Sequence, residues 1–447
     1  MENTKDSILL TGKLHKIYLK FTLPALIAML ISGIQGMIDG IFVGNIIGSN
    51  AMASVNIAIP FLQLIIGLSM VVSIGAQSHI GLKLGFGSVK EAQDTFQSFF
   101  RIIIVVAAGI TCLGVFFSEE IARLIGANDV LIEETAIYIR TLAFFAIPIV
   151  LMFYFGFLNR IIGKPEMYFK GTILSLLVNI SMDYLLIAKL QWGIFGAALA
   201  TGLSYSSALL IVVWPMLDRK NIINALTGCF DKRCVKPVLF NGSSEGVNSL
   251  SIALNAYLFN MMMMKIAGED GVAAFTAINY VANLGILISF GISDGVGPIV
   301  SYNYGYGNFE RVKKSMRIAY IVNLCLGILV FSVLFFCGES LVSIFIKDNQ
   351  EIIDIATQGG KLYGIAFLMA GFNILNSGYF TFIGQGLNSV MVAASRGVIF
   401  VTISIFVLPI FIGINGVWLS VPFAELCSML IGLYLLHKNT KKDKIHR

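Results

Sequence analysis

The sequence predicts an all-α protein that crosses a membrane twelve times and consists of two parallel six-helix repeats. Three observations lead to this fold class. First, 57% of the 447 residues are hydrophobic and only 13% are charged, whereas soluble domains are roughly 25% charged. Second, twelve apolar runs of helical length follow one another along the chain. Third, the second half repeats features of the first at an offset of about 220 residues.

The apolar runs are long enough to cross a bilayer as helices, because a helical span needs about 20 residues. Helices also pair every backbone group internally, as lipid requires. We expect six spans near residues 18–43, 52–82, 97–118, 135–158, 167–188 and 193–217. After a polar linker, we expect six more near 237–264, 272–301, 317–338, 355–382, 388–411 and 416–436.

This order divides the chain into four parts. We expect an N-lobe over 1–217, a cytoplasmic linker over 218–236, a C-lobe over 237–436 and a basic cytoplasmic tail over 437–447. Lys13, Lys16 and Lys20 recur at helical spacing before the first span, which predicts a short interfacial helix leading into it. No small-residue cleavage site is evident near the start, so we expect no signal peptide.

Basic residues set the expected orientation of the spans. With the N-terminus in the cytoplasm, 25 of the 31 Lys and Arg residues fall on the cytoplasmic side. The others are Arg123, Arg140, Lys189, Lys265, Lys347 and Lys361. Because cytoplasmic loops carry the excess of basic residues in membrane proteins, we expect a multi-pass protein of the cytoplasmic membrane with both termini in the cytoplasm.

The internal repeat is clearest around short glycine turns. At the offset of about 220 residues, Ser73, Gly75, Gly85 and Gly87 align with Ser293, Gly295, Gly305 and Gly307, Gly48 aligns with Gly268, and Gly193 aligns with Gly413. Six spans is an even number, so the two halves share one orientation in the membrane. Parallel repeats of this kind are typical of secondary transporters and predict a substrate path between the halves.

Five acidic residues fall inside the expected spans: Asp39, Asp183, Glu245, Asp294 and Glu425. An Asp at the centre of a spanning helix costs roughly 2.5–3.5 kcal/mol on insertion scales, and such residues usually serve an ion or substrate path. Asp39 and Asp183 lie near the outer ends of spans 1 and 5. At the helical rise, both are about 8–9 Å below the outer surface, which is what a shared site requires.

Two polar residues lie at a similar depth. Asn179 precedes Asp183 by about one helical turn, and Thr201 lies in the outer half of span 6. Two carboxylates in a dry site cannot both be charged cheaply, so this group could take up a proton or hold Na⁺ with oxygen ligands. The equivalent positions of the second half hold Phe259, Ile399, Ile403 and Val421. The alternative is that each Asp caps a broken helix or bonds nearby backbone.

Glu245, Asp294 and Glu425 are secondary candidates for a functional role. Each of them could line a transport cavity. Each could equally pair with the backbone or with Arg396. The sequence leaves both possibilities open.

A glycine series in span 1 has two interpretations. Gly33, Gly36, Gly40 and Gly44 follow helical spacing along one face. Small residues allow helices to pack closely, and they also make the helix around Asp39 easier to bend. Of the two roles, packing is the one we expect.

Three other features carry weaker signals. His79 lies alone in span 2, and the run from Met261 to Met264 is more typical of lipid-facing or core methionines than of a pocket. Cys229 and Cys234 lie in the basic linker without clustered His, which is a weak zinc signal.

Several separated motifs resemble those of the multidrug and toxic compound extrusion (MATE) family: MIDGIFVGNIIGSNAMASVNIAIP, LVNISMDYLLI, WGIFGAALAT, GPIVSYNYGYGN and GINGVWLSVPFAE. The resemblance covers nearly the whole chain and is greatest to the prokaryotic branch with an acidic N-lobe site. It implies a V-shaped pair of six-helix lobes that exports cationic and amphiphilic compounds in exchange for H⁺ or Na⁺.

The resemblance also implies roles for particular residues. In the similar branch, Asp39, Asn179, Asp183 and Thr201 would form the ion-coupling site. Tyr184 departs from the motif, which often has Pro after the Asp, so span 5 is expected to be straighter here. Another branch of the family uses C-lobe acids, and Glu245, Asp294 and Glu425 remain secondary candidates.

These observations predict a secondary active multidrug efflux transporter with no enzymatic activity and no cofactor other than its coupling ion. Its expected partners are small organic cations or amphiphiles and the lipid bilayer, not nucleic acid, and we expect a monomer. The alternative is a flippase for lipid-linked oligosaccharides or cell-wall precursors from the same superfamily, although the spans offer few basic residues for a pyrophosphate. We find no H-E-x-x-H, G-x-S-x-G or ATP-binding P-loop motif.

Overall fold

The protein is described here from a computed structural model that covers residues 7–345 and 349–445. Over these residues the chain forms helices and no β-strand, which confirms the all-α prediction. Residues 1–6, 346–348 and 446–447 lie outside the described part. They include Lys347, which we predicted outside the cytoplasm, and both ends of the chain, which we predicted in the cytoplasm.

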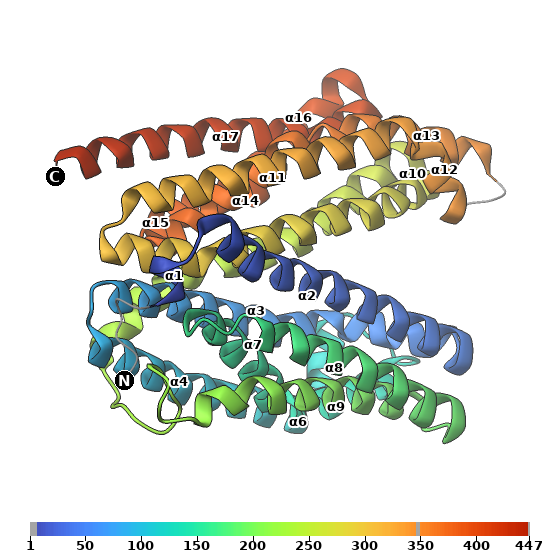
Figure 1. The fold of residues 1–447 in the computed structure, drawn as a ribbon. Helices are drawn as coiled ribbons and strands as arrows, with labels where there is room; N and C mark the ends of the chain where they lie inside the picture. Colours follow the sequence, from blue (N-terminus) through green and yellow to red (C-terminus); the bar gives the residue numbers. More distant parts are fainter. Residues whose placement is uncertain (1–6, 346–348, 446–447) are drawn as a thin grey trace. The chain divides into compact units, whose positions relative to one another are not determined.

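The first half of the chain forms six long helical segments (Figure 1). They are α2 (Leu14–Phe42) continued by the π-helix η2 (Val43–Ile47), α3 (Ser49–Gly85), α4 (Val89–Phe116), α6 (Ile132–Phe144) with α7 (Ala146–Ile161), α8 (Glu166–Met182) continued by the π-helix η3 (Asp183–Lys189), and α9 (Gly193–Val213). The short helices α1 (Ile8–Thr11), α5 (Ser118–Leu124) and η4 (Trp214–Leu217) lie between or beside them.

The second half contains the corresponding segments. They are α10 (Val235–Tyr306), which follows the short η5 (Lys232–Cys234), then α11 (Phe309–Phe336), α12 (Gly338–Phe345), α13 (Gln350–Gly364) with α14 (Phe367–Phe382), α15 (Gly386–Ala394) continued by the π-helix η6 (Ser395–Ile399) and α16 (Phe400–Ile412), and α17 (Ile414–Ile445). Helix α10 contains two spans, because its backbone leaves the helical conformation at Gly268 (φ 62°, ψ −150°).

These segments account for twelve spans. In the described residues, 9 helices are long and apolar enough to cross a membrane, or up to 11 if the bent pairs α6–α7 and α13–α14 each count as one span. The break at Gly268 divides the longest of them into two. The number and approximate limits of the spans therefore agree with the apolar runs of the sequence.

The repeat is visible in the backbone as well as in the sequence. Gly87 and Gly307 both have φ 81°, and Gly193 and Gly413 both have φ 58°, a left-handed region that glycine adopts without steric cost. The bend between α6 and α7 is 51°, and the bend between α13 and α14 is 48°. Matching turns and bends at one offset show that the two halves repeat the same six-helix plan.

Contacts divide the chain into two units, and none of the three boundaries lies in the linker. The first unit extends to Gly242 and also takes in Ser301–Phe309. The second comprises Ser243–Val300 and resumes at Glu310. Two of the boundaries thus fall inside helix α10, near the start of its first part and near the end of its second, and the third falls at the start of α11.

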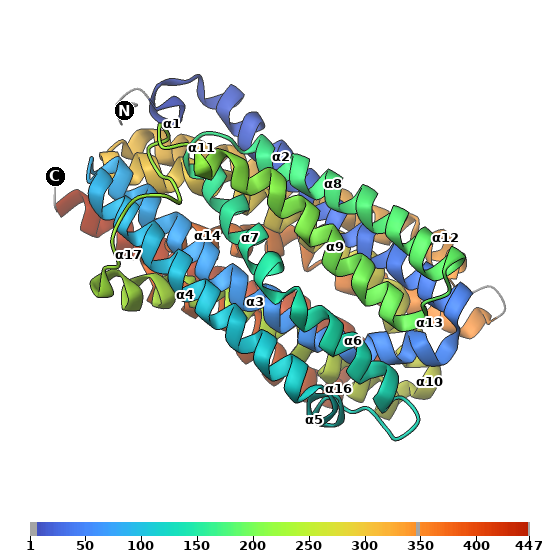
Figure 2. The same cartoon turned by 90° about the horizontal axis from the view of Figure 1, so that it is seen from below.

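Within the first unit, three helices form the framework of the candidate site. Helix α8 packs along both α2 and α9 (Figures 1 and 2). The π-helix η2 at the end of α2 contacts η3 and α9. These contacts bring together the ends of spans 1, 5 and 6, which carry the polar residues singled out by the sequence.

The second unit has its own aromatic core. The rings of Phe259 and Phe275 stack with centroids 4.8 Å apart, and Tyr363 and Trp418 pack around them. The methionine run divides between the two expected roles: Met262 and Met263 are buried in this core, whereas Met261 and Met264 are exposed.

The N-terminal basic segment differs from the prediction. Lys16 and Lys20 belong to the first turns of α2 itself, which begins at Leu14, and not to a separate interfacial helix. From residue 7 onward, where the structure describes the chain, the only helix before it is the single turn α1. Lys20 Nζ donates to the carbonyl oxygen of Gly163 at 3.3 Å. The amphipathic segment therefore continues directly into the span because no residue between them interrupts the helix.

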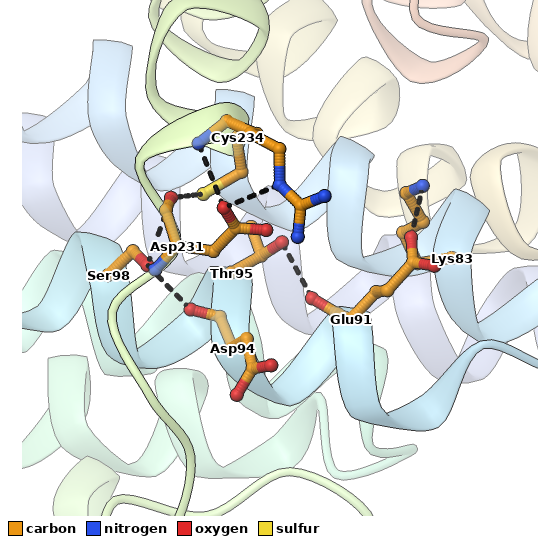
Figure 3. Close-up of polar contacts among 8 residues, drawn as sticks. Lys83, Glu91, Asp94, Thr95, Ser98, Asp231 and Cys234 are labelled. Carbon is orange, nitrogen blue, oxygen red and sulfur yellow. Dashed lines mark hydrogen bonds and ion pairs between the residues drawn. The ribbon is translucent and has the colours of Figure 1, made fainter.

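The linker is held along one face of α4. Gln93 Nε2 donates to the carbonyl oxygens of Asn224 and Thr227 at 2.6 Å each, and Gln97 Nε2 donates to that of Ala225 at 2.8 Å. At the next residue, Ser98 Oγ accepts from Asp231 N–H at 2.7 Å (Figure 3). The linker backbone thus replaces water as the partner of these α4 side chains.

Asp231 organises the end of the linker. Its carboxylate accepts from the backbone N–H of Arg233 at 2.9 Å and from Arg233 Nε at 3.1 Å. These hydrogen bonds hold the pKa of Asp231 below its ordinary value. Cys234 Sγ donates to the Asp231 carbonyl oxygen at 3.0 Å (Figure 3), so this thiol takes part in the turn.

Two glycines of span 1, Gly36 and Gly40, do not serve the close packing that we expected. A Cβ atom added at Gly36 or Gly40 would meet no described atom within 4 Å, whereas one added at Gly44 would lie 3.0 Å from Met52 Sδ. The packing prediction is therefore wrong for Gly36 and Gly40. Close backbone contact in the first unit occurs elsewhere, where α3 meets the ends of α10.

We expect Gly242→Ala to destabilise the first unit. The new Cβ would overlap the carbonyl oxygen of Val71, which belongs to the backbone and cannot turn away as a side chain could. Overpacking typically costs about 1–3 kcal/mol. The measurement is the melting temperature in detergent, with Gly36→Ala as the matched control in open space. Equal melting temperatures for the two variants would contradict this contact.

Candidate ion-binding site

The structure brings the four predicted site residues of the first unit together. Asp39 lies near the end of α2, Asn179 in the last turn of α8, Asp183 at the start of η3, and Thr201 in the middle of α9. The Asp39 side chain interacts with those of Asp183, Asn179 and Thr201. Three helices that are distant in sequence thus supply one polar cluster, as the equal depths of Asp39 and Asp183 predicted.

The cluster is shielded from solvent. Asn179 is 0% exposed, Asp183 1% and Thr201 3%, while Asp39 is half-buried. Buried polar groups without hydrogen-bond partners are costly. Even so, Asp39 Oδ1, Asp183 Oδ2 and both polar side-chain atoms of Asn179 lack a hydrogen-bond partner of good geometry among the described residues. The side chains meet but leave part of their bonding capacity unused.

The local backbone explains how two carboxylates can face each other here. The N–H of Val43 bonds to the carbonyl oxygens of both Asp39 and Gly40, where α2 widens into η2. Helix α8 widens into η3 at Asp183. Short π segments often occur at functional sites because they re-aim side chains. Span 5 is continuous, as expected with Tyr184 in place of Pro, but its winding changes at Asp183.

A second polar layer lies one turn further along the same three helices. Gln35 Nε2 donates to Ser204 Oγ at 3.2 Å, and Ser175 Oγ donates to Gln35 Oε1 at 3.4 Å. All three residues are buried. Ser204 Oγ also donates to the Thr201 carbonyl oxygen at 2.7 Å. This layer connects spans 1, 5 and 6 directly below the carboxylates.

Sequence reasoning missed this second layer and two tyrosines. Gln35 precedes Asp39 by four residues and Ser175 precedes Asn179 by four, so helical spacing from the acids could have identified them. Tyr138, buried on α6, interacts with Thr201 and lies near both carboxylates, and Tyr205 lies near Asp39. No local signal separates these tyrosines from the others of the chain.

We expect Gln35→Leu to loosen the cluster. The change removes two hydrogen bonds and takes away the partner of the Ser175 hydroxyl, at about 1 kcal/mol for each bond. It should lower the melting temperature, and combining it with Ser204→Ala should cost less than the two single changes added. The control is Ser32→Ala, one turn away, whose hydroxyl bonds only to its own helix at Ala28. Fully additive effects would show that Gln35 and Ser204 do not act together.

The secondary candidates belong to the second unit and lie in a different environment. Glu425 is paired with Arg396, whose Nη2 and Nε donate to Glu425 Oε1 at 2.8 and 3.1 Å. Glu245 Oε2 accepts from Asn248 Nδ2 at 3.4 Å, and Glu245 also lies near Asp294 and Arg396. Of the two possibilities left open by the sequence, pairing with Arg396 holds for Glu425.

His79 lies away from the carboxylate cluster. It lines a cavity of about 350 Å³ with Lys83, Glu91, Asp231 and Arg233, next to the docked linker. Lys83 and Glu91 form an ion pair there, visible in Figure 3. His79 is therefore part of the linker contact region of the first unit.

Twelve apolar spans in two parallel repeats, with a buried and incompletely bonded carboxylate pair in one of them, define an integral membrane transporter. Comparison with known families then identifies which one: residues 24–185 and 246–411 match the MatE family model. The chain belongs to the MatE family, as the sequence motifs indicated.

Individual relatives agree over the full length. The chain is 26% identical over 440 residues to the multidrug export protein MepA of Staphylococcus aureus, covering 96% of this chain and 95% of that protein. It is 25% identical over 448 residues to MepA of Staphylococcus saprophyticus, covering 98% and 97%. A structure described as the outward-facing conformation of a multidrug resistance MATE family transporter has a TM-score of 0.91 at 21% identity and covers 99% of both chains. This likeness confirms the fold of two six-helix repeats.

Proposed function

We propose that this chain is a secondary active transporter that exports organic cations or amphiphilic compounds in antiport with H⁺ or Na⁺ by alternating access. The names of its relatives, which are multidrug export proteins, support export of multiple drugs. The carboxylate cluster of the first unit supports coupling to a cation. In this proposal the protein works as a monomer in the cytoplasmic membrane.

The observation that carries the proposal is the incompletely bonded pair of Asp39 and Asp183. Two carboxylates at one buried place repel each other when both are charged, so uptake of one cation lowers their energy. A carboxyl buried only for structure would be expected to have its hydrogen bonds complete. Here oxygens of both residues lack a partner of good geometry among the described residues, so they are available to a proton or an ion.

The donor set fits either coupling ion. Carboxylate oxygens of Asp39 and Asp183, the amide oxygen of Asn179 and the hydroxyl of Thr201 are hard oxygen ligands of the kind that hard cations prefer. These four side chains would hold Na⁺, which would supply the positive charge that the pair lacks. With H⁺ as the coupling ion, the same carboxylates would share the proton. In both cases, the bound ion would neutralise the negative charge of the carboxylates before the helices rearrange.

Reconstituted transport tests the proposal. Purified protein in liposomes should accumulate organic cations when a pH gradient or a Na⁺ gradient is imposed, and the gradient that drives uptake identifies the ion. A panel of cationic dyes should compete with one another. Movement of anionic pyrophosphate lipids without any effect on cationic dyes would reject the proposal in favour of the flippase alternative.

We expect the linker on the cytoplasmic side, because most basic residues fall there under the proposed orientation. In a Cys-free background, Lys232→Cys should stay unlabelled by a membrane-impermeant maleimide in intact cells and should react after the membrane is opened. Lys189→Cys, at the opposite end of a span, is the control and should react in intact cells. Labelling of the Lys232→Cys variant from outside would reverse the proposed orientation.

A further inference from the structure

The second unit contains a carboxylate whose cation is part of the chain. Glu425 Oε1 accepts from Arg396 Nη2 and Nε at 2.8 and 3.1 Å, and its Oε2 accepts from Asn373 Nδ2 at 2.6 Å. The side chains of Arg396 and Glu425 are only 11% and 4% exposed. Both carboxylate oxygens are therefore bonded, unlike those of Asp39 and Asp183.

The repeat relates this ion pair to the candidate site of the first unit. Arg396 lies on span 11 and Glu425 on span 12, the counterparts of spans 5 and 6, which carry Asp183 and Thr201. At the offset of the repeat, Arg396 corresponds to Leu176, an apolar residue. The two units thus place a carboxylate among equivalent helices, but only the second supplies a guanidinium to it.

Space and further oxygen atoms adjoin the pair. A cavity of about 80 Å³ is lined by Arg396 and Glu425 together with Asn248, Asn255 and Tyr363. A cavity of this size can hold water or a small ion, since one water needs only about 10–15 Å³ of such volume. Its lining supplies amide and hydroxyl oxygens, which are ligands of hard cations.

The charges around Arg396 are unbalanced. Besides Glu425, it lies near Glu245 on the first span of α10, which in turn lies near Asp294 on the second span of α10. Tyr363 of α13 interacts with both members of the pair. Glu425 and Glu245 thus provide two carboxyls against this one guanidinium. A neutral residue at position 396 would leave Glu425 beside an oxygen-lined cavity with no positive charge, which favours uptake of a cation.

We propose that Arg396 acts as a tethered cation that fills an ion site of the second unit, so that this unit does not exchange H⁺ or Na⁺. The statement about exchange rests on the proposed antiport function, whereas the occupation of the site by Arg396 does not. The guanidinium is covalently attached to the chain and cannot diffuse away. Its two hydrogen bonds to Glu425 take the place of the contacts that a bound small cation would make. Arg396 is thus a positioning residue that confines ion binding to the first unit.

The test measures cation binding by thermal stability, without transport. The full-length protein carries Asp39→Asn and Asp183→Asn to silence the first unit, and Na⁺ is titrated against choline at fixed pH. With Arg396 intact, we expect no Glu425-dependent response. After Arg396→Met, the melting temperature should rise saturably with Na⁺, or rise as the pH is lowered from 8 to 5. Adding Glu425→Gln should remove that rise.

Two further variants keep the test decisive. Arg396→Lys retains a charge and should remain unresponsive to Na⁺ and pH. If Arg396→Met cannot be purified, Arg396→Ala is prepared with millimolar methylguanidinium, which should raise its melting temperature while tetramethylammonium does not. A folded Arg396→Met protein with no response to Na⁺ or pH would overturn the proposal. So would a Glu425-dependent response with Arg396 intact, or a failure of methylguanidinium to stabilise Arg396→Ala.

These outcomes are independent of the proposed transport function. If the unsubstituted protein shows no ion-driven transport but Arg396→Met gains a Glu425-dependent cation response, antiport is rejected and the tethered cation stands. If transport is ion-driven but the Arg396 variants show no response, the antiport proposal stands and the tethered-cation proposal is rejected.

Discussion

Asp39→Asn is expected to abolish most ion-driven efflux, and Asp183→Asn should do the same. The two carboxylates meet within one buried cluster, so each single change removes the repulsion that makes the other bind a cation. A coupling free energy between two sites is typically about 1–3 kcal/mol, or about 5- to 150-fold, and we expect gradient-driven efflux to fall by a factor in this range. Folding should survive, because a neutral amide is easier to bury than a charge.

The double variant decides between a coupled pair and two separate acids. If Asp39 and Asp183 act as one titrating unit, the double variant should be little worse than either single variant at matched expression. Asp129→Asn, an exposed acid paired with Arg123 in a loop, is the control and should leave efflux unchanged. Two mild effects that simply add would indicate independent structural acids, and the coupling site would then have to be sought around Glu245.

Breaking the Arg396–Glu425 pair should have the largest effect on stability. Removing one partner of a buried ion pair costs about 3–5 kcal/mol, because the other charge stays buried without compensation, whereas replacing both by apolar residues is often neutral. We therefore expect Arg396→Met and Glu425→Leu each to destabilise the protein strongly. The double variant should be close to the unsubstituted protein.

A double-mutant cycle on unfolding in detergent measures this coupling. The matched control is the pair of Lys314 and Glu310, 3.3 Å apart on α11, whose side chains are 69% and 82% exposed. Exposed pairs of this kind contribute about 0.3–0.5 kcal/mol, so neither single change there should be noticeable. Additive losses for Arg396 and Glu425 would mean that the two side chains stabilise the second unit independently.

The sequence by itself determined the membrane class, the spans and the repeat. Each rests on local information. An apolar run of sufficient length forms a helix in lipid regardless of its neighbours. A left-handed turn favours glycine because of its local backbone dihedral angles. The repeat recovered from glycine matches reappears as equal φ values and similar bend angles. The cluster of Asp39, Asn179, Asp183 and Thr201 was also predictable, because depth in the membrane follows from distance to the end of a helix.

Only the tertiary structure decided which side chains face one another. Counting residues from the end of a helix gives the depth of a side chain in the membrane, but not the side of the helix axis on which it points. That direction depends on the rotation of the helix, which is set by packing against its neighbours. For this reason the sequence could not choose between backbone and Arg396 as the partner of Glu425, and it did not find Tyr138 beside the carboxylates. The same reason explains the wrong prediction for Gly36 and Gly40: their spacing marks a face of the helix, but only the packed bundle decides whether another helix lies against it.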